Sequence, residues 1–79
     1  MIRITSVKPL DNYKLFLTFT NGQEGIFDAK PYLDEGSVFI ELQNISLFNS
    51  VRTIYGGTIG WANGADLCPD CVYLGTQFV

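Results

Sequence analysis

The chain has no histidine among its 79 residues and only two cysteines. The absence of histidine removes the commonest general base at neutral pH, every Ser-His or Cys-His pair, and the commonest metal ligand. We therefore expect no catalytic residue of these types, no cofactor and no metal site.

Charged residues are scarce, at 16% of the chain against 47% hydrophobic residues, whereas about 25% is typical of globular domains. Three of the five basic residues, namely Arg3, Lys8 and Lys14, lie at the start, and the chain from Leu15 onward has two basic and seven acidic residues. Phosphate backbones are bound through several Lys or Arg contacts, so we expect no direct binding of nucleic acid.

Long apolar runs are also missing, because no stretch approaches the ~18 residues that a membrane span requires. The first five residues alternate like a strand and do not resemble a signal peptide. Two cysteines without a secretory signal favour free thiols in a reducing compartment. The sequence predicts a cytoplasmic protein with no membrane partner.

What is present is β-hairpin patterning. The segments Ile2–Leu10, Tyr13–Phe19 and Gln23–Asp28 are rich in strand formers. Asp11-Asn12 is a turn signal, and Asn21-Gly22 is the strongest short hairpin signal, because both central positions of a type I′ turn need a positive φ. These segments predict an antiparallel sheet.

A two-residue turn at Asn21-Gly22 would pair Thr20 with Gln23, Leu17 with Ile26 and Phe16 with Phe27. One face of the sheet would then carry a set of large apolar side chains: Leu15, Leu17, Phe19 and Ile26. The opposite face would still carry Phe16 and Phe27, so we expect both faces to be covered.

Two short helices are expected next. Ser37 is a candidate N-cap for a helix that begins at Val38, and Ser46 for a helix over Leu47–Val51. Helices of this length are unstable alone and must pack on the sheet. The expected fold is α+β: a small antiparallel β-hairpin sheet with two short helices packed on it, in one domain over residues 1–79.

A further hairpin is predicted over Val51–Tyr55 and Thr58–Trp61, which flank Gly56-Gly57. A two-residue turn would pair Ile54 with Ile59 and Arg52 with Trp61. The guanidinium could then lie on the indole face, a cation–π contact worth ~0.5–1 kcal/mol when exposed.

This hairpin supplies the candidate binding residues Arg52, Trp61, Asn63 and Asp66. Asn63-Gly64 is a turn signal, and Asp66 follows closely, so an aromatic ring, a cation, an amide and a carboxylate would meet at a strand-end loop. In the alternative interpretation, Trp61 packs into the core, and Asn63 and Asp66 hydrogen-bond their own turn.

Cys68-Pro69-Asp70-Cys71 is the motif that suggests chemistry, because a CxxC can be half of a zinc site or a redox pair. A third cysteine and a histidine are both missing, so the simpler interpretation is two partly buried free thiols at a turn. Asp66 and Asp70 are four residues apart and could form a carboxylate pair. A small enzyme that uses Asp66 and Asp70, or Cys68, is therefore the alternative function.

Most of the chain resembles the bacterial domain-of-unknown-function family 2442. The resemblance is carried by these segments: Val7-Lys8-Pro9-Leu10; Leu15 to Phe19 with Asn21-Gly22 and Phe27-Asp28; Val38-Phe39, Leu42, Leu47-Phe48 and Val51; and, most specifically, Gly57-Thr58-Ile59, Trp61, Asn63-Gly64-Ala65-Asp66-Leu67, Pro69-Asp70 and Tyr73.

The resemblance implies a compact α+β fold of antiparallel strands and short helices in small bacterial proteins. It implies no catalytic residues, since none are assigned in the family, and Cys71 departs from the residue usual at its position. Some relatives carry the domain before a helix-turn-helix regulator, and some are encoded beside another small protein in a toxin–antitoxin-like arrangement.

A non-enzymatic protein-interaction or small-ligand-binding module is therefore the leading hypothesis. The few charges, the two-sided apolar hairpin and the apolar segments Val72–Leu74 and Phe78-Val79 predict a homo-oligomer or a small protein partner. The regulatory domain of a helix-turn-helix transcription regulator is a second alternative.

Overall fold

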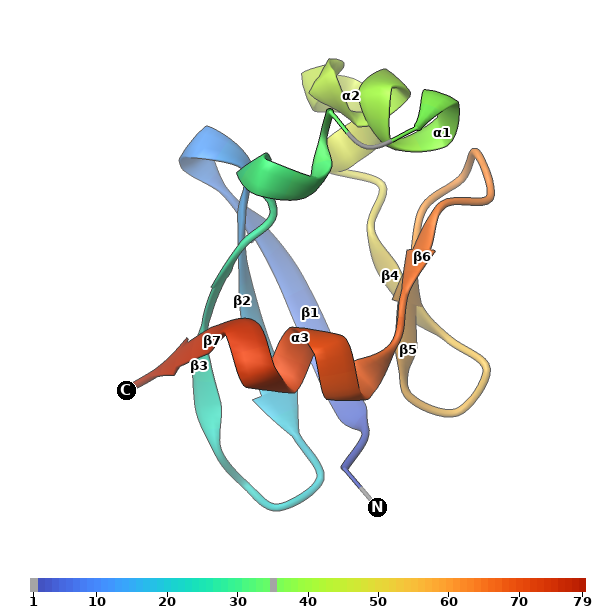
Figure 1. The fold of residues 1–79 in the computed structure, drawn as a ribbon. Helices are drawn as coiled ribbons and strands as arrows, with labels where there is room; N and C mark the ends of the chain where they lie inside the picture. The colour runs from blue at the N-terminus through green and yellow to red at the C-terminus, as the bar shows by residue number, and fades with distance from the viewer. Residues whose placement is uncertain (1, 35) are drawn as a thin grey trace.

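The strands form two antiparallel sheets in the computed structural model, which describes residues 2–34 and 36–79 (Figure 1). The first sheet has the order β1-β2-β3-β7 and the second the order β4-β5-β6. The strands are β1 (Ile4–Leu10), β2 (Lys14–Phe19), β3 (Glu24–Asp28), β4 (Arg52–Ile54), β5 (Thr58–Gly60), β6 (Asp66–Leu67) and β7 (Thr76–Phe78). The α+β class is confirmed, but the strands divide into two sheets, whereas the sequence predicted one.

The described residues form three short α-helices: α1 (Ser37–Ile40), α2 (Ile45–Phe48) and α3 (Pro69–Gly75). In Figure 1, α1 and α2 lie together above the strands, and α3 crosses in front of the first sheet and leads directly into β7. The first two helices correspond to the predicted pair, although their bounds differ, and α3 adds a third.

The predicted caps of the first two helices are wrong. The α2 N-cap is Asn44, whose Oδ1 accepts hydrogen bonds from the backbone N–H groups of Ser46 (2.9 Å) and Leu47 (3.4 Å). The α2 helix therefore starts earlier than expected and ends at Phe48, before Val51. Ser37 is the first residue of α1, and Gly36 is its N-cap.

The predicted register of the first hairpin is wrong by one residue. The structure pairs Leu17 with Gly25 and Phe16 with Ile26. The loop is longer than two residues because Gly22 N–H bonds Phe19 O and Phe19 N–H bonds Gln23 O, both at 2.9 Å. Of the two residues expected to have a positive φ, only Gly22 has one, at +86°, which rules out the two-residue type I′ turn.

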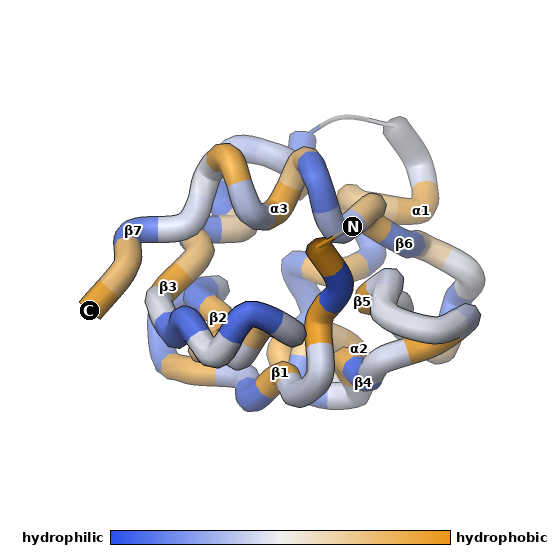
Figure 2. The backbone as a smooth tube through the Cα atoms, turned by 90° about the horizontal axis from the view of Figure 1, so that it is seen from below, coloured by the Kyte–Doolittle hydropathy of each residue, from blue (hydrophilic) through white to orange (hydrophobic). Residues whose placement is uncertain are grey.

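This change of register places Phe27, and not Ile26, on the core face of the sheet, because side chains alternate along a strand. The buried residues of that face are Leu15, Leu17, Phe19 and Phe27. Phe16 and Ile26 are paired on the other face and are half-buried. Figure 2 shows α3 over one side of β2 and β3.

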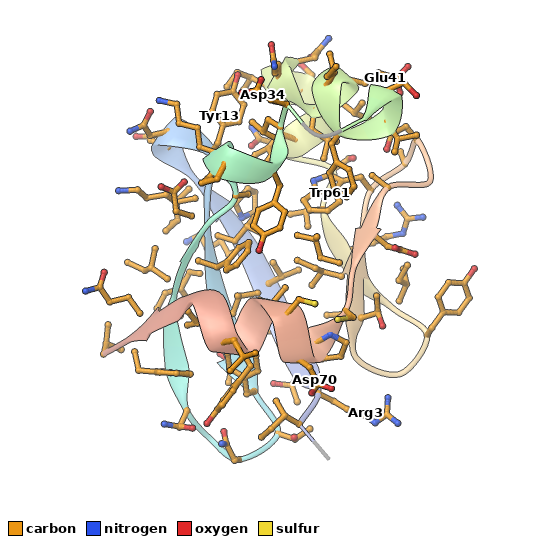
Figure 3. All side chains as sticks on the ribbon, viewed as in Figure 1. Arg3, Tyr13, Asp34, Glu41, Trp61 and Asp70 are labelled. Carbon is orange, nitrogen blue, oxygen red and sulfur yellow. The ribbon has the colours of Figure 1, made fainter. Side chains whose placement is uncertain are left out.

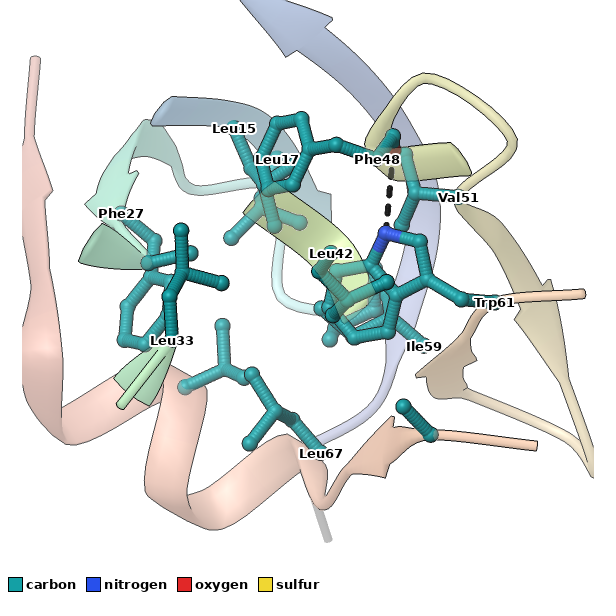
Figure 4. Packing of buried hydrophobic residues seen from close by; sticks show 14 of the residues in the cluster. Leu15, Leu17, Phe27, Leu33, Leu42, Phe48, Val51, Ile59, Trp61 and Leu67 are labelled. Carbon is teal, nitrogen blue, oxygen red and sulfur yellow. Dashed lines mark hydrogen bonds between the residues drawn. The ribbon is translucent and has the colours of Figure 1, made fainter. Parts of the chain in front are cut away.

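A single cluster of buried side chains joins the two sheets and the helices (Figure 4). Its members are Ile4, Leu15, Leu17, Phe19, Phe27, Ala29, Leu33, Leu42, Phe48, Val51, Ile59, Trp61, Ala65, Leu67 and Val72. Because α1 and α2 are only four residues long, their stability comes from packing and not from helix propensity: Phe48 of α2 belongs to the cluster, and the partly buried Phe39 of α1 packs against it.

The capping difference gives a matched pair of variants. Asn44→Ala removes the acceptor of two backbone donors and should lower the free energy of unfolding by about 1 kcal/mol. Ser46→Ala should change it by less than about 0.5 kcal/mol, since the Ser46 side chain is exposed. Chemical denaturation of both variants checks this expectation. Equal losses would contradict the observed cap.

Candidate functional site

Trp61 belongs to the core and not to a surface patch. Only 3% of the residue is exposed, and its indole Nε1–H donates a 3.0 Å hydrogen bond to the backbone oxygen of Phe48. Its ring packs near those of Phe48 and Phe39, with centroids 6.1 and 6.5 Å away. Figure 3 shows Trp61 inside the molecule beneath the helices. The indole face is therefore not available to a partner.

Arg52 is exposed on β4 and lies opposite Gly60. The predicted Arg52–Trp61 and Ile54–Ile59 pairs are wrong, because the loop has three residues and not two, and Ile54 pairs with Thr58. Tyr55 adopts a positive φ of 46° ahead of Gly56 and Gly57, which adds one residue to the turn. The proposed cation–π contact therefore does not form.

Asn63 ties two distant segments together. Its Oδ1 accepts a hydrogen bond from Ala65 N–H (3.1 Å), which closes its own turn. Its Nδ2 donates to Val38 O and to Glu41 Oε1, both at 2.8 Å. These contacts join the β5–β6 turn to α1 and the following 3₁₀ turn Glu41–Gln43. Both polar atoms of the Asn63 amide are therefore engaged in hydrogen bonds within the protein.

Asp66 lies on β6 with an exposed side chain, and Asp70 is exposed in the first turn of α3. Neither residue lines either of the two hollows described below. A carboxylate that works in acid–base catalysis is usually held in a concave pocket that shifts its pKa. The four candidate residues are thus two exposed side chains, a buried ring and a structural amide.

Cys68 and Cys71 are free and exposed, so the expectation of partly buried thiols is wrong. Their Sγ atoms lie 2.9 Å apart, and Cys68 Sγ accepts a 3.4 Å hydrogen bond from Cys71 N–H. Cys68 is the N-cap of α3 and follows β6 directly. Among the described residues, no group of three or more Cys, Asp or Glu is placed to hold a metal.

Two of the open hollows on the surface are lined by described residues. One, of about 360 Å³, lies between the start of β1 and the β4–β5 loop and is lined by Arg3 and Tyr55, among others. The other, of about 320 Å³, is lined by Tyr13, Lys30, Leu33, Asp34 and Gln43. Sequence analysis missed both, because each joins segments that are far apart along the chain.

The first sheet ends at β7, whose outer edge pairs with no other strand of the described chain. Leu74 near the end of α3 and Val79 just after β7 are both 86% exposed, and Phe78 within β7 is 37% exposed. Phe78 packs against Tyr73 and Phe19, with ring centroids 5.0 and 5.9 Å away. We call Leu74, Phe78 and Val79 the β7 edge patch. No charged residue occurs from Cys71 to Val79.

The opposite edge of the same sheet is obstructed. At β1, Ile4 N–H donates a 3.0 Å hydrogen bond to Gly57 O. A Cβ on Gly57 would meet Arg3 Cβ at 2.5 Å, so glycine is needed for this close approach. β1 also carries the exposed Lys8 and the half-buried Pro9, and both residue types discourage edge pairing. The β7 edge patch is therefore the candidate functional site.

The described residues thus form a small α+β domain with two antiparallel sheets, a shared core and an open, uncharged strand edge at β7. The chain belongs to the family described as "Protein of unknown function (DUF2442)", whose model matches residues 4–77. Comparisons with curated proteins and with solved structures gave no match. The resemblance noted from the sequence is confirmed.

None of the helices in the described residues is long and apolar enough to cross a membrane.

The roles of Asn63 and Asp66 can be separated by mutation. Asn63→Ala removes hydrogen bonds to three groups and should lower the free energy of unfolding by about 1 kcal/mol or more. Asp66→Asn, at an exposed position, should change the free energy of unfolding by less than about 0.5 kcal/mol. Urea denaturation gives both values. A stable Asn63→Ala variant would contradict the structural role.

Proposed function

We propose that this domain is a non-enzymatic protein-interaction module that pairs through the β7 edge with a second copy of itself. The observation that carries the proposal is an open, uncharged edge strand flanked by exposed apolar residues. Large exposed apolar groups gathered on a small domain favour an interaction surface.

The backbone of β7 supports strand pairing. Val79 N–H bonds Glu24 O at 3.0 Å, and hydrogen-bonded positions alternate along an antiparallel pair. Gln77, opposite Ile26, therefore directs its backbone groups toward β3, and Phe78 directs its N–H and C=O away from β3. A strand added in antiparallel orientation would accept a hydrogen bond from Phe78 N–H and donate one to Phe78 C=O. The sheet would then continue into a second subunit.

A second copy is the occupant that fits this edge best. In a two-fold symmetric dimer, β7 of one subunit would pair with β7 of the other. Because residues 71–79 carry no charged side chain, no like charges would meet at this interface. Natural sheets protect an open edge with Lys, Pro, a bulge or a very short strand. Thr76–Phe78 has no Lys or Pro, and although it has only three residues, Val79 N–H extends its pairing with β3 to Glu24 O. The few charges in the chain as a whole agree with a surface that is partly covered.

The test is a comparison of two double variants by analytical ultracentrifugation. Leu74→Lys with Val79→Lys places charges at the β7 edge patch and should raise the dimer dissociation constant at least tenfold. Ile45→Lys with Tyr55→Lys is the matched control, because both residues are exposed apolar side chains elsewhere. It should leave the constant unchanged.

Circular dichroism should show the fold retained in both variants. A parent protein that sediments as a monomer at its highest soluble concentration would refute the proposal. So would equal weakening by the two double variants. If the parent protein associated only with a different protein, through a strand of that protein, the homodimer would be refuted and that protein would be the partner at the β7 edge.

A further inference from the structure

The cysteine pair at the start of α3 is a second feature with chemical potential, and it does not depend on the proposed dimer. Cys68 Sγ and Cys71 Sγ are 2.9 Å apart, and both residues are exposed. A buried thiol cannot react with solutes, and two thiols that lie far apart cannot close an intramolecular disulfide. These two sulfurs are adjacent and open to solution.

The backbone holds the sulfurs together. Pro69 follows Cys68 at the first helical position, which suits its fixed φ. Val72 N–H donates a 3.2 Å hydrogen bond to Cys68 O, and the Val72 side chain is fully buried. The turn that carries both cysteines is thus anchored to the core, so their proximity is part of the fold.

We propose that Cys68 and Cys71 form a redox site, a dithiol that low-molecular-weight disulfides oxidise reversibly to an intramolecular disulfide.

In the first step, the Cys68 thiolate attacks one sulfur of the small disulfide RSSR. A bond forms between Cys68 Sγ and that sulfur, the S–S bond of RSSR breaks, and one RS⁻ leaves. In the second step, the Cys71 thiol gives its proton to water, its sulfur attacks Cys68 Sγ, and the second RS⁻ leaves. Counted from the dithiol, the protein has lost two electrons to RSSR and two protons to water, one when Cys68 ionised and one from Cys71. The two RS⁻ take up two protons from water, so RSSR has become two RSH.

The electrostatics of the pair assign these roles. The hydrogen bond from the Cys71 side chain lowers the pKa of Cys68, and the backbone N–H of Cys71 adds to this effect. The same side-chain contact raises the pKa of Cys71. The negative charge of Asp70 raises the pKa of both thiols, but for Cys68 the hydrogen bonds outweigh it. Cys68 is therefore the attacking thiol and Cys71 the resolving thiol.

The experiment equilibrates the full chain with mixtures of reduced and oxidised glutathione, then traps remaining thiols by alkylation and measures the intact mass. The parent should lose two hydrogens, take up no alkylating reagent, and return to the dithiol as reduced glutathione increases. Cys71→Ser, which keeps Cys68 alone, should instead accumulate one glutathione adduct. Cys68→Ser should form its adduct more slowly at neutral pH.

A second measurement tests the hydrogen bond between the sulfurs. The pH dependence of Cys68 alkylation should have a lower midpoint in Cys71→Ser, whose hydroxyl can still donate, than in Cys71→Ala, which has no donor. Equal midpoints would overturn the assignment of roles. A parent protein that keeps two free thiols in excess oxidised glutathione, retains a glutathione adduct, or forms disulfide-linked dimers would overturn the redox site.

Discussion

The fold depends on one buried hydrogen bond, from Trp61 Nε1–H to Phe48 O (Figure 4). It joins the second sheet to α2, two units that have few residues each and could not fold alone. An unsatisfied buried donor or acceptor costs about 1–3 kcal/mol, a large fraction of the stability of a small domain. The bond thus disfavours other placements of the indole, and it holds the end of β5, next to Trp61, close to α2.

Much of the fold could be predicted from local patterns, but strand register could not. The alternation of β2 identified the core face correctly at Leu15, Leu17 and Phe19. Both hairpins shifted by one residue because loop length depends on the φ of single residues, here Tyr55 in the second loop. One extra loop residue moved Phe27 inward and moved Arg52 away from Trp61.

The candidate binding residues could not be placed from the sequence for a related reason. Whether Trp61 faces inward depends on Phe48, and the amide of Asn63 is occupied by Val38 and Glu41, residues 25 and 22 positions earlier in the chain. A turn signal such as Asn63-Gly64 identifies the turn but not its partners. The apolar character of the C-terminal segment was visible in the sequence. Its position at a sheet edge was not, because that required the β3–β7 pairing.

The cysteine pair lies at the start of α3, and Phe78 and Val79 of the β7 edge patch lie beyond its end, since α3 starts beside Cys68 and runs into β7. Two anchors lie between them: the buried Val72, and Thr76 Oγ1–H, which donates a 2.6 Å hydrogen bond to Val72 O. A Cβ on Gly75 would meet the Phe27 ring at 2.8 Å, so the end of the helix is also packed closely on β3. Closely packed segments resist small displacements. Closure of a disulfide at the first turn can therefore proceed without moving the strand edge, and the two proposed activities are separable within the same segment.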